Sequence, residues 1–577
     1  MAALLFCAGV IAAAHAASRH FDILIRNGEV LDGTGAPRYR ADVAINGDEI
    51  AAIGYMPEAT ADRVVDAQNR IVTPGFIDMH AHVVDAAYGE SGLYSSDVKR
   101  RAAQNYVAQG VTTVVTNPDG SQSMPLRELS RTLTSKGFGL NVVMMNGHSG
   151  LRRIVMKGDI HRAANAAEIR QMQEMLRDDL EREGSFGMSL GLEYDPAKDA
   201  STEEQIALGK VLANYNGVFI PHLRSQGTAP MWYKPSQNRG RTPPTLDDSI
   251  DETLKVAEAG ATVVFTHFRA WEPGYRGTAA RLVERLQAAR DRGSRIYMDV
   301  YPYDSSFSDG QFVAVPPWAF AGAPDEDYTA RTTFDYRKAL NTTLASADDA
   351  KRRDFADDVR HQLALKGGTE NVRVLAYPDG SYVGKTYAEL MQLRALDEPG
   401  LAIALQREGD PHYAGGARMR SFSIDEADIE SFYRLDWCAV STDGWIVLPE
   451  EAVGEKKYVN TNRRLFGSYP RRLAYFSVQR KVDTLEHAVR AMSGLPAQIL
   501  SINDRGRIAA GMKADVVVID TSRLKDNTTF VEPSVYPSGV DHVLVNGKFA
   551  VDGGKRTLTL AGRILEPSGR AKASKGR

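Results

Sequence analysis

The chain has 577 residues, more than one hydrophobic core normally organises, so we expect a large domain and a smaller one. Its 70 Lys and Arg residues nearly balance its 73 Asp and Glu residues, for a net charge of −3. This balance argues against nucleic acids and anionic membranes as partners and favours a small-molecule substrate.

Residues 1–17 have the composition of a secretory signal peptide. The apolar run over residues 2–14 is too short to span a bilayer, and Ala14-His15-Ala16 fits a small-x-small cleavage site, although a basic n-region is absent. We therefore expect export to the periplasm or the medium. Cys7 would leave with this peptide and Cys438 would remain alone, so the mature chain would have no intramolecular disulfide.

Both ends of the chain alternate apolar and polar residues in short segments, which is typical of β-strands. At the N-terminal end this pattern covers residues 18–70, and at the C-terminal end it covers residues 505–565. The tail over residues 566–577 consists of small, charged and proline residues and is expected to be disordered.

Between these ends, residues 71–504 alternate apolar β-branched runs with helical patterns, which predicts βα units and a parallel sheet. Eight candidate strands lie near residues 71–80, 111–116, 140–145, 186–192, 217–221, 262–266, 295–300 and 437–442. Eight units predict a (β/α)8 barrel of the TIM type, with the active site at the C-terminal strand ends. Residues 303–436 are too many for a loop and predict an insertion on the active-site face.

The first candidate barrel strand ends in His80-Ala81-His82. Residues i and i+2 of a strand point to the same side, so both imidazoles face one point in space and can begin a metal site. Hydrogen-bonded core or surface histidines are the alternative, which Pro74-Gly75 and Asp78 before the motif make less favoured.

Further residues of ligand type follow the other candidate strands. They are Asp119, His148, Glu193, His222, His267, Tyr301 and Asp443. Five of the 12 histidines of the chain therefore fall at predicted strand ends. Imidazoles with carboxylates, and no thiolate, suit zinc in a hydrolase, or alternatively iron, manganese or cobalt.

The His80-Ala81-His82 motif with its Pro-Gly lead resembles the amidohydrolase superfamily, and the similarity to the D-aminoacylases, the N-acyl-D-amino-acid deacylases, spans almost the whole chain. This resemblance implies that the β segments at the two ends fold together as one discontinuous β-sandwich and that the insertion closes over the substrate. It also implies that His222 and His267 bind a second metal ion, and that Asp443 is both a metal ligand and the general base. One or two zinc ions are the expected cofactor.

The ligand that bridges two metal ions departs from the D-aminoacylase pattern. That family uses a Cys near the end of strand two, where this chain has Asp119. Other superfamily members place a carboxylated Lys on strand four, which here ends at Glu193. Because a Glu supplies two anionic oxygens without carbon dioxide, we assign Glu193 as the bridge. We expect Asp119 to be a turn residue, with metal contact as the alternative.

The resemblance assigns five residues to the substrate: Arg269, Tyr301, Arg464, His148 and Arg152. An arginine holds a carboxylate with paired donors, and Arg269 stands where the family has a Lys. Tyr303 is the alternative to Tyr301, and Arg463 is the alternative to Arg464. His148 and Arg152 match a family segment beside the site, without a defined role.

These features predict a metal-dependent amidohydrolase that cleaves N-acyl-D-amino acids to a carboxylate and a free D-amino acid. A dipeptidase for peptides with a C-terminal D-residue is a related alternative. A cyclic-amide hydrolase of the dihydroorotase or hydantoinase type is less favoured. From a different class, the chain could be an exported binding protein that has lost turnover, which a metal assay and an activity screen would distinguish.

Overall fold

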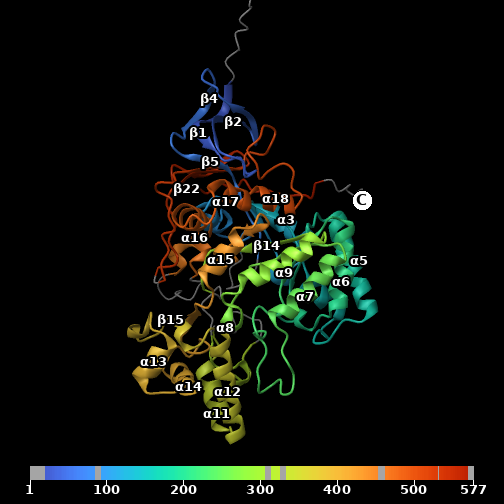
Figure 1. Cartoon of the computed structure of the whole chain (residues 1–577), viewed down its shortest axis with the longest axis vertical. Helices are drawn as coiled ribbons and strands as arrows, with labels where there is room; N and C mark the ends of the chain where they lie inside the picture. The colour runs from blue at the N-terminus through green and yellow to red at the C-terminus, as the bar shows by residue number, and fades with distance from the viewer. Residues whose placement is uncertain are drawn as a thin grey trace, which may run out of the picture.

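A computed structural model describes residues 20–84, 92–305, 313–324, 333–452, 462–530 and 532–568. The expected signal peptide at residues 1–17 and residues 569–577 of the expected tail lie outside these ranges. Figure 1 shows three parts along the long axis: a β-rich part, a middle part with parallel strands and helices, and a mainly helical part at the opposite end.

The two ends of the chain share one sheet. Its strands are β1 (His20–Val30), β2 (Tyr39–Asn46), β3 (Glu49–Gly54), β4 (Thr60–Asp66), β5 (Ile71–Pro74), β19 (Val516–Ile519), β20 (Val540–Val545), β21 (Lys548–Asp552) and β22 (Lys555–Arg556). They are ordered β22-β21-β20-β19-β5-β1-β2-β3, and β4 also pairs with β1. β19 runs antiparallel to β5, so the C-terminal segment is hydrogen bonded directly to the N-terminal one. β-branched side chains such as Ile25, Val43 and Val516 fill the core under this sheet.

The first predicted barrel strand, over residues 71–80, is divided between two sheets. Residues 71–74 form β5 of the large sheet, and a separate parallel strand, β6 (Phe76–Asp78), begins after Gly75. The backbone of Gly75 lies so close to the side chain of Thr112 that a Cβ would collide with it. The chain therefore crosses from one sheet to the other at a residue that must be glycine.

Parallel strands form the middle part. They are β6, β8 (Val111–Val115), β9 (Asn141–Val143), β10 (Asn146–Gly147), β11 (Gly187–Gly191), β12 (Val218–His222), β13 (Thr262–Phe265), β14 (Ile296–Val300) and β17 (Cys438–Val440). They pair in chain order as β6-β8-β9 and as β10-β11-β12-β13-β14-β17. Short β7 (Ala81–His82) and β18 (Gly444–Trp445), which follow β6 and β17, also pair in parallel. All these strands therefore end at one edge.

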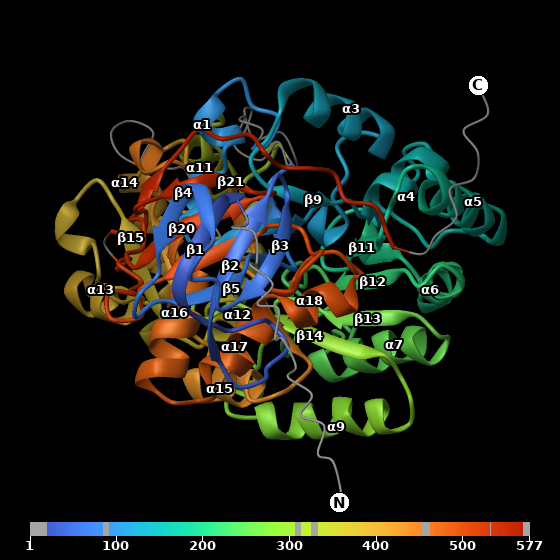
Figure 2. The ribbon, with the colours of Figure 1, turned by 90° about the horizontal axis from the view of Figure 1, so that it is seen from above.

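Helices alternate with these strands and cover their outer side. They include α3 (Leu126–Lys136), α4 (His148–Met156), α5 (Ala166–Arg182), α6 (Thr202–Asn214), α7 (Leu246–Glu258), α9 (Ala279–Asp291), α15 (Glu426–Tyr433), α16 (Arg464–Arg471), α17 (Leu485–Met492) and α18 (Gly494–Ile499). Figure 2 shows α5, α6, α7 and α9 outside β11 to β14. Capping boxes at Asn165 and Thr245 begin α5 and α7. Within the described ranges, no helix has both the length and the apolar character to cross a bilayer.

The insertion between β14 and β17 has a hydrophobic core of its own. It contains α11 (Tyr336–Ala345), α12 (Asp349–Leu365), β15 (Val372–Ala376), α13 (Tyr387–Arg394), α14 (Glu398–Glu408) and β16 (Arg418–Ser421). β15 and β16 pair antiparallel. The chain then returns through α15, whose buried side chains belong to the core of the middle part. The indole of Trp271 donates to the carbonyl of Leu365 at 3.0 Å, so the insertion contacts the middle part directly.

Candidate metal centre

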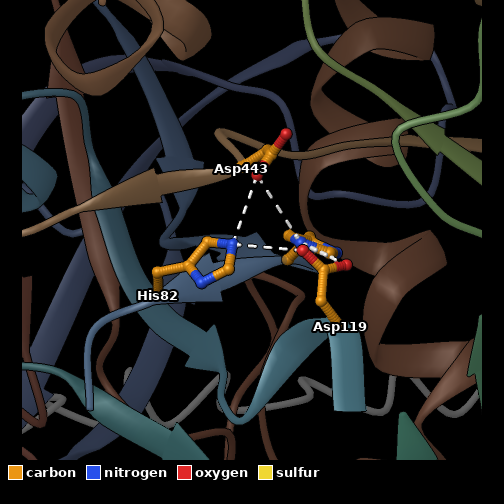
Figure 3. A group of neighbouring side chains, drawn as sticks. His82, Asp119 and Asp443 are labelled. Atoms are coloured by element: carbon orange, nitrogen blue, oxygen red, sulfur yellow. Dashed lines mark ion pairs between the residues drawn. The ribbon is translucent and has the colours of Figure 1, made fainter. Parts of the chain in front are cut away.

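Four histidines and two aspartates meet where the parallel strands end. His80 and His82 follow β6, and His222 is the last residue of β12. His267 and Asp443 follow β13 and β17 within three residues. Asp119 lies in the short helical turn η2 (Pro118–Gly120) after β8. Figure 3 shows His82, Asp119 and Asp443 facing one another.

Asp119 lies at the centre of this group. Its Oδ1 is 3.5 Å from Nε2 of His80, 3.4 Å from Nδ1 of His222 and 3.5 Å from Nε2 of His267. Its Oδ2 is 3.5 Å from Nε2 of His82. The residues therefore form two sets that share Asp119.

Asp443 completes the first of these sets. Its Oδ1 lies 3.6 Å from Nε2 of His80 and 3.4 Å from Nε2 of His82. One set is thus His80, His82, Asp119 and Asp443, and the other is Asp119, His222 and His267.

The spacing of these atoms fits divalent metal ions. Two ligand atoms bound about 2.1 Å from one tetrahedral ion are about 3.4 Å apart, close to the separations within each set. Nε2 of His80 is also buried and has no hydrogen-bond partner, as expected of a nitrogen that donates its lone pair to a cation. The donor set of imidazoles and carboxylates suits zinc or a similar ion.

Neighbouring charges keep the carboxylates ionised. Burial would raise the pKa of Asp119, but His80 and His222 hold this pKa well below its ordinary value. Burial would also raise the pKa of Asp443, but Arg464, His82 and His80 lower it. Both aspartates are therefore anionic near neutral pH and ready to bind a cation.

The histidines titrate differently from one another. Burial lowers the pKa of His267 to about 3, which leaves its imidazole neutral. Burial also disfavours the charged form of His222, but Asp119 and Glu193 outweigh this and raise its pKa to about 9. A metal ion that binds His222 would therefore replace a proton.

Three of the converging residues have left-handed backbones. The φ angles are 53° at Asp119, 34° at His267 and 47° at Asp443. Non-glycine residues rarely take this conformation, and it costs on the order of 1–3 kcal/mol at each position. Such strain is typical of functional sites, where the surrounding structure holds the side chain in place.

Buried polar side chains behind the histidines hydrogen bond to their rings or backbone and so hold them in place. The ring Nδ1 of His80 is 2.7 Å from the hydroxyl of Thr266, and the backbone N–H of His267 donates to Asp299 at 2.8 Å. Asp78 accepts from the backbone N–H of His80 at 3.1 Å. Sequence reasoning did not identify Thr266 or Asp299; the only signal for Asp299 was a charged residue inside the apolar run of β14.

Glu193 does not lie where the sequence-based assignment placed it. Its Oε2 is 2.8 Å from Nε2 of His222, the ring nitrogen that faces away from Asp119, and Glu193 belongs to neither ligand set. Asp119, which we expected to be a turn residue, occupies the central position. The geometry corrects the assignment of the shared position to Glu193: Asp119 does lie in a turn, but this turn points its carboxylate at the histidines, whereas Glu193 contacts the other side of the His222 ring.

His148 and Arg152, assigned to the substrate, are buried elsewhere. Nε2 of His148 lies 2.7 Å from Glu204, and Nη1 of Arg152 donates to the same carboxylate at 2.5 Å. Their neighbours Ser149 and Arg153 line the cavity instead. The assignment is corrected because α4 turns His148 and Arg152 towards α6.

A cavity of about 360 Å³ opens over the metal-binding residues. Arg269 and Arg464 line it, with Trp271, Trp445, Tyr194 and Met231 among the other lining residues. Nη1 of Arg269 donates to the Tyr301 hydroxyl at 2.5 Å, and Nη2 of Arg464 is 2.8 Å from Oδ2 of Asp443.

The two alternatives considered for the substrate lie away from the cavity. The hydroxyl of Tyr303 donates to Asp526 at 2.8 Å, and Nη2 of Arg463 lies 3.2 Å from the same carboxylate. Tyr303 and Arg463 therefore anchor the segment around Asp526, whereas Arg464 faces the cavity.

Comparisons with known proteins agree with this site. The amidohydrolase family profile matches residues 63–348 and 460–551. The chain is 29% identical to an N-acyl-D-glutamate deacylase of Alcaligenes xylosoxydans xylosoxydans over 91% of this chain and 93% of that protein.

Two solved structures are also similar. One is a D-aminoacylase with a binuclear metal centre, at 25% identity and a TM-score of 0.69, covering 95% of this chain and 100% of that one. The other is an N-acyl-D-glutamate deacylase from Bordetella bronchiseptica, complexed with zinc and a phosphonate that mimics the tetrahedral intermediate. It shares 25% identity and a TM-score of 0.68, covering 96% of this chain and 100% of that one.

Proposed function

The chain belongs to the amidohydrolase family, and on that premise we propose that it is a metal-dependent hydrolase that cleaves N-acyl-D-amino acids to a carboxylate and a free D-amino acid. The observation that carries this proposal is the pair of ligand sets sharing Asp119, next to a cavity lined by two arginines. Similarity to deacylases along almost the whole chain supports it.

In this proposal Asp119, rather than Glu193, would be the ligand common to two metal ions. It is the residue common to both ligand sets, and its two oxygens are within 3.5 Å of all four histidines. A carboxylate in this position offsets the mutual repulsion of two cations. When bound, zinc or a similar ion supplies Lewis acidity that polarises the acyl carbonyl and makes the attacking water more acidic.

Asp443 is the general base and then the general acid. Arg464 holds its Oδ2 at 2.8 Å, and its Oδ1 faces Nε2 of His80 and His82, so the carboxylate would lie beside a water bound to the metal ion there. Its lowered pKa keeps it ionised and able to accept the proton of that water. Asp443 then delivers this proton to the amine nitrogen as the amide bond breaks.

Arg269 and Arg464 bind the α-carboxylate of the substrate. Nε of Arg269 and both Nε and Nη1 of Arg464 are buried and have no hydrogen-bond partner. Buried guanidinium donors without acceptors are costly, so an anion is the ligand they fit. Tyr301 positions Arg269 through the hydrogen bond from Nη1.

We propose the finer architecture on the strand pairing of this chain. We infer that the parallel strands close into a (β/α)8 barrel, because β7 and β18 extend the first and last strands and pair with each other. We infer also that the sheet shared by the chain ends is part of a discontinuous β-sandwich, and that the insertion acts as a cap.

A paired substrate series tests the proposed function. N-acetyl derivatives of the same amino acids in D and L forms, with dipeptides that end in a D-residue, are incubated with zinc-loaded protein and assayed for free amine. We expect the N-acetyl-D compounds to be hydrolysed in preference to their L partners. Metal binding without hydrolysis of any compound would contradict the proposal and favour a binding protein.

A further inference from the structure

Glu193 connects a metal-binding histidine to the wall of the cavity. It follows β11 and is 6% exposed. Its Oε2 lies 2.8 Å from Nε2 of His222, and its Oε1 accepts the backbone N–H of Met231 at 2.5 Å. Met231 lines the cavity. One buried carboxylate therefore contacts both a candidate ligand and the segment that encloses the substrate.

The contact with His222 determines which ring nitrogen can bind metal. Nδ1 of His222 faces Asp119 at 3.4 Å, so Nδ1 is the nitrogen available to an ion in the shared site. Nε2 lies 2.8 Å from Glu193 and also 2.8 Å from the side-chain amide of Gln226. With Nδ1 turned to an ion, Nε2 carries the ring hydrogen, and Glu193 is its anionic acceptor. A carboxylate acceptor orients the ring and makes the ligating nitrogen more basic.

The contact with Met231 holds the segment between β12 and α7. Within this segment, Lys234 donates from Nζ to the carbonyl of Met231 at 2.5 Å and to the carbonyl of Tyr233 at 3.1 Å. The backbone N–H of Ser236 donates to Asp358 of α12 at 3.0 Å. The segment is therefore held by the insertion on one side and by Glu193 on the other.

We propose that Glu193 is a positioning residue that fixes the His222 imidazole for metal binding and fixes Met231 at the cavity wall. This inference rests on the proposed function, because it requires a metal ion at His222. A glutamine has one oxygen where Glu193 uses two acceptors. In Glu193→Gln, either His222 or Met231 must therefore face an N–H donor in place of an oxygen.

The test measures metal affinity in Glu193→Gln by competition with a chromophoric chelator, beside the absorption spectrum of the cobalt-loaded protein. We expect two metal equivalents to bind, one of them about 10- to 100-fold more weakly than in the parent, with an altered cobalt spectrum. KM should rise through the Met231 contact. Glu193→Asp keeps the charge, but its shorter side chain reaches only one of the two donors. Its metal affinity should therefore lie between those of the parent and Glu193→Gln.

Glu204→Gln is the matched control. It removes the carboxylate from another buried His–Glu pair, at 2.7 Å from His148, which does not line the cavity. We expect lower thermal stability and unchanged metal affinity.

Two results would overturn the inference about Glu193. Parent-like affinity and cobalt spectrum in Glu193→Gln would show that the carboxylate positions nothing. Complete loss of one metal equivalent in both Glu193 variants would show that Glu193 is itself a ligand. Failure of the proposed function is a separate result, because the parent protein would then bind no metal or leave every acyl-D-amino acid intact.

Discussion

The carboxylate of Asp119 can face all four histidines because its backbone is left-handed, with φ 53°. An L-residue takes this conformation at a cost of about 1–3 kcal/mol, which the ordered surroundings of the turn must offset. The residue thus combines two roles, turn residue and candidate metal ligand, that the sequence presents as alternatives. It is in a turn, and it is the residue common to both candidate ligand sets.

Asp119→Asn should bind less metal and lose most of its turnover. The amide is neutral and has only one oxygen, so it cannot offset the repulsion of two cations or offer each an anionic oxygen. Metal content of the dialysed variant should fall from two equivalents towards one. Asp119→Cys, which restores an anionic ligand atom, should retain more metal than the Asn variant. Two tightly bound equivalents in Asp119→Asn would place the bridge elsewhere.

Asp443→Asn should slow turnover about 10²- to 10⁴-fold, the usual contribution of a general acid–base residue. KM should change less, because Arg269 and Arg464 remain to bind the carboxylate. Steady-state kinetics at fixed zinc would separate the two parameters. A variant with nearly parental kcat would mean that another group moves the proton.

The sequence indicated which residues of ligand type lie at strand ends. It did not indicate which of them face the candidate metal site directly and which only contact another ligand. His80, His82, His222, His267 and Asp443 were predicted from their positions after apolar runs, and the structure brings all five together. Glu193 has the same sequence signature, yet it contacts the far side of the His222 ring. The direction in which a turn points its side chain depends on backbone angles that a single sequence does not display.

At the scale of elements, α12 of the insertion holds the segment that forms one cavity wall. Asp358 accepts from the backbone N–H of Ser236 at 3.0 Å, from its hydroxyl at 2.6 Å and from the indole of Trp318 at 2.7 Å. Asp358 is fully buried. This single carboxylate therefore joins the insertion to the segment that carries Met231.

Asp358→Ala should lower the free energy of unfolding by about 1–3 kcal/mol for each donor left without an acceptor, and should raise KM as the segment loosens. Asp354→Ala is the control, one turn earlier on α12. Asp354 pairs with Arg239, which is largely exposed, so this change should cost at most about 1 kcal/mol. Denaturant titration and kinetics of both variants test the difference. Equal effects would contradict this role of Asp358.

Helices and strands were predicted more accurately than the joints between them. The apolar runs near 217–221 and 262–266 became β12 and β13. The change of sheet at Gly75 was missed, because β5 and β6 read as one continuous apolar run. What separates them is a close backbone approach to Thr112, which depends on tertiary structure.

At the scale of the whole molecule, Asp515 connects the shared sheet to the parallel strands. It is buried, lies 2.5 Å from Nη1 of Arg505 and accepts from the side chain of Asn141 on β9 at 2.9 Å. It also accepts the backbone N–H of Asn546 at 2.7 Å. The sheet built from the chain ends is thus joined to the middle part by a buried charged network.

Export through residues 1–17 stays a prediction.

Asp515→Ala should lower the free energy of unfolding by about 3 kcal/mol, because it leaves the buried Arg505 with only the exposed carboxylate of Asp504 as a charge partner and removes the acceptor of Asn141 and Asn546. Lys513→Ala is the control nearby. Its ion pairs with Asp48 and Glu49 are partly exposed, so its loss should cost at most about 1 kcal/mol. Denaturant unfolding followed by fluorescence would measure both. A smaller loss for Asp515→Ala than for Lys513→Ala would contradict the role of this network.

Metal-dependent cleavage of N-acyl-D-amino acids can be tested by removing and restoring the metal. The protein is stripped with a chelator, its metal content is measured, and hydrolysis of an N-acetyl-D-amino acid is followed as zinc is added in steps. We expect no turnover in the stripped protein and recovery within the first two equivalents of zinc, with cobalt or manganese able to substitute. Full turnover by verifiably metal-free protein would contradict it.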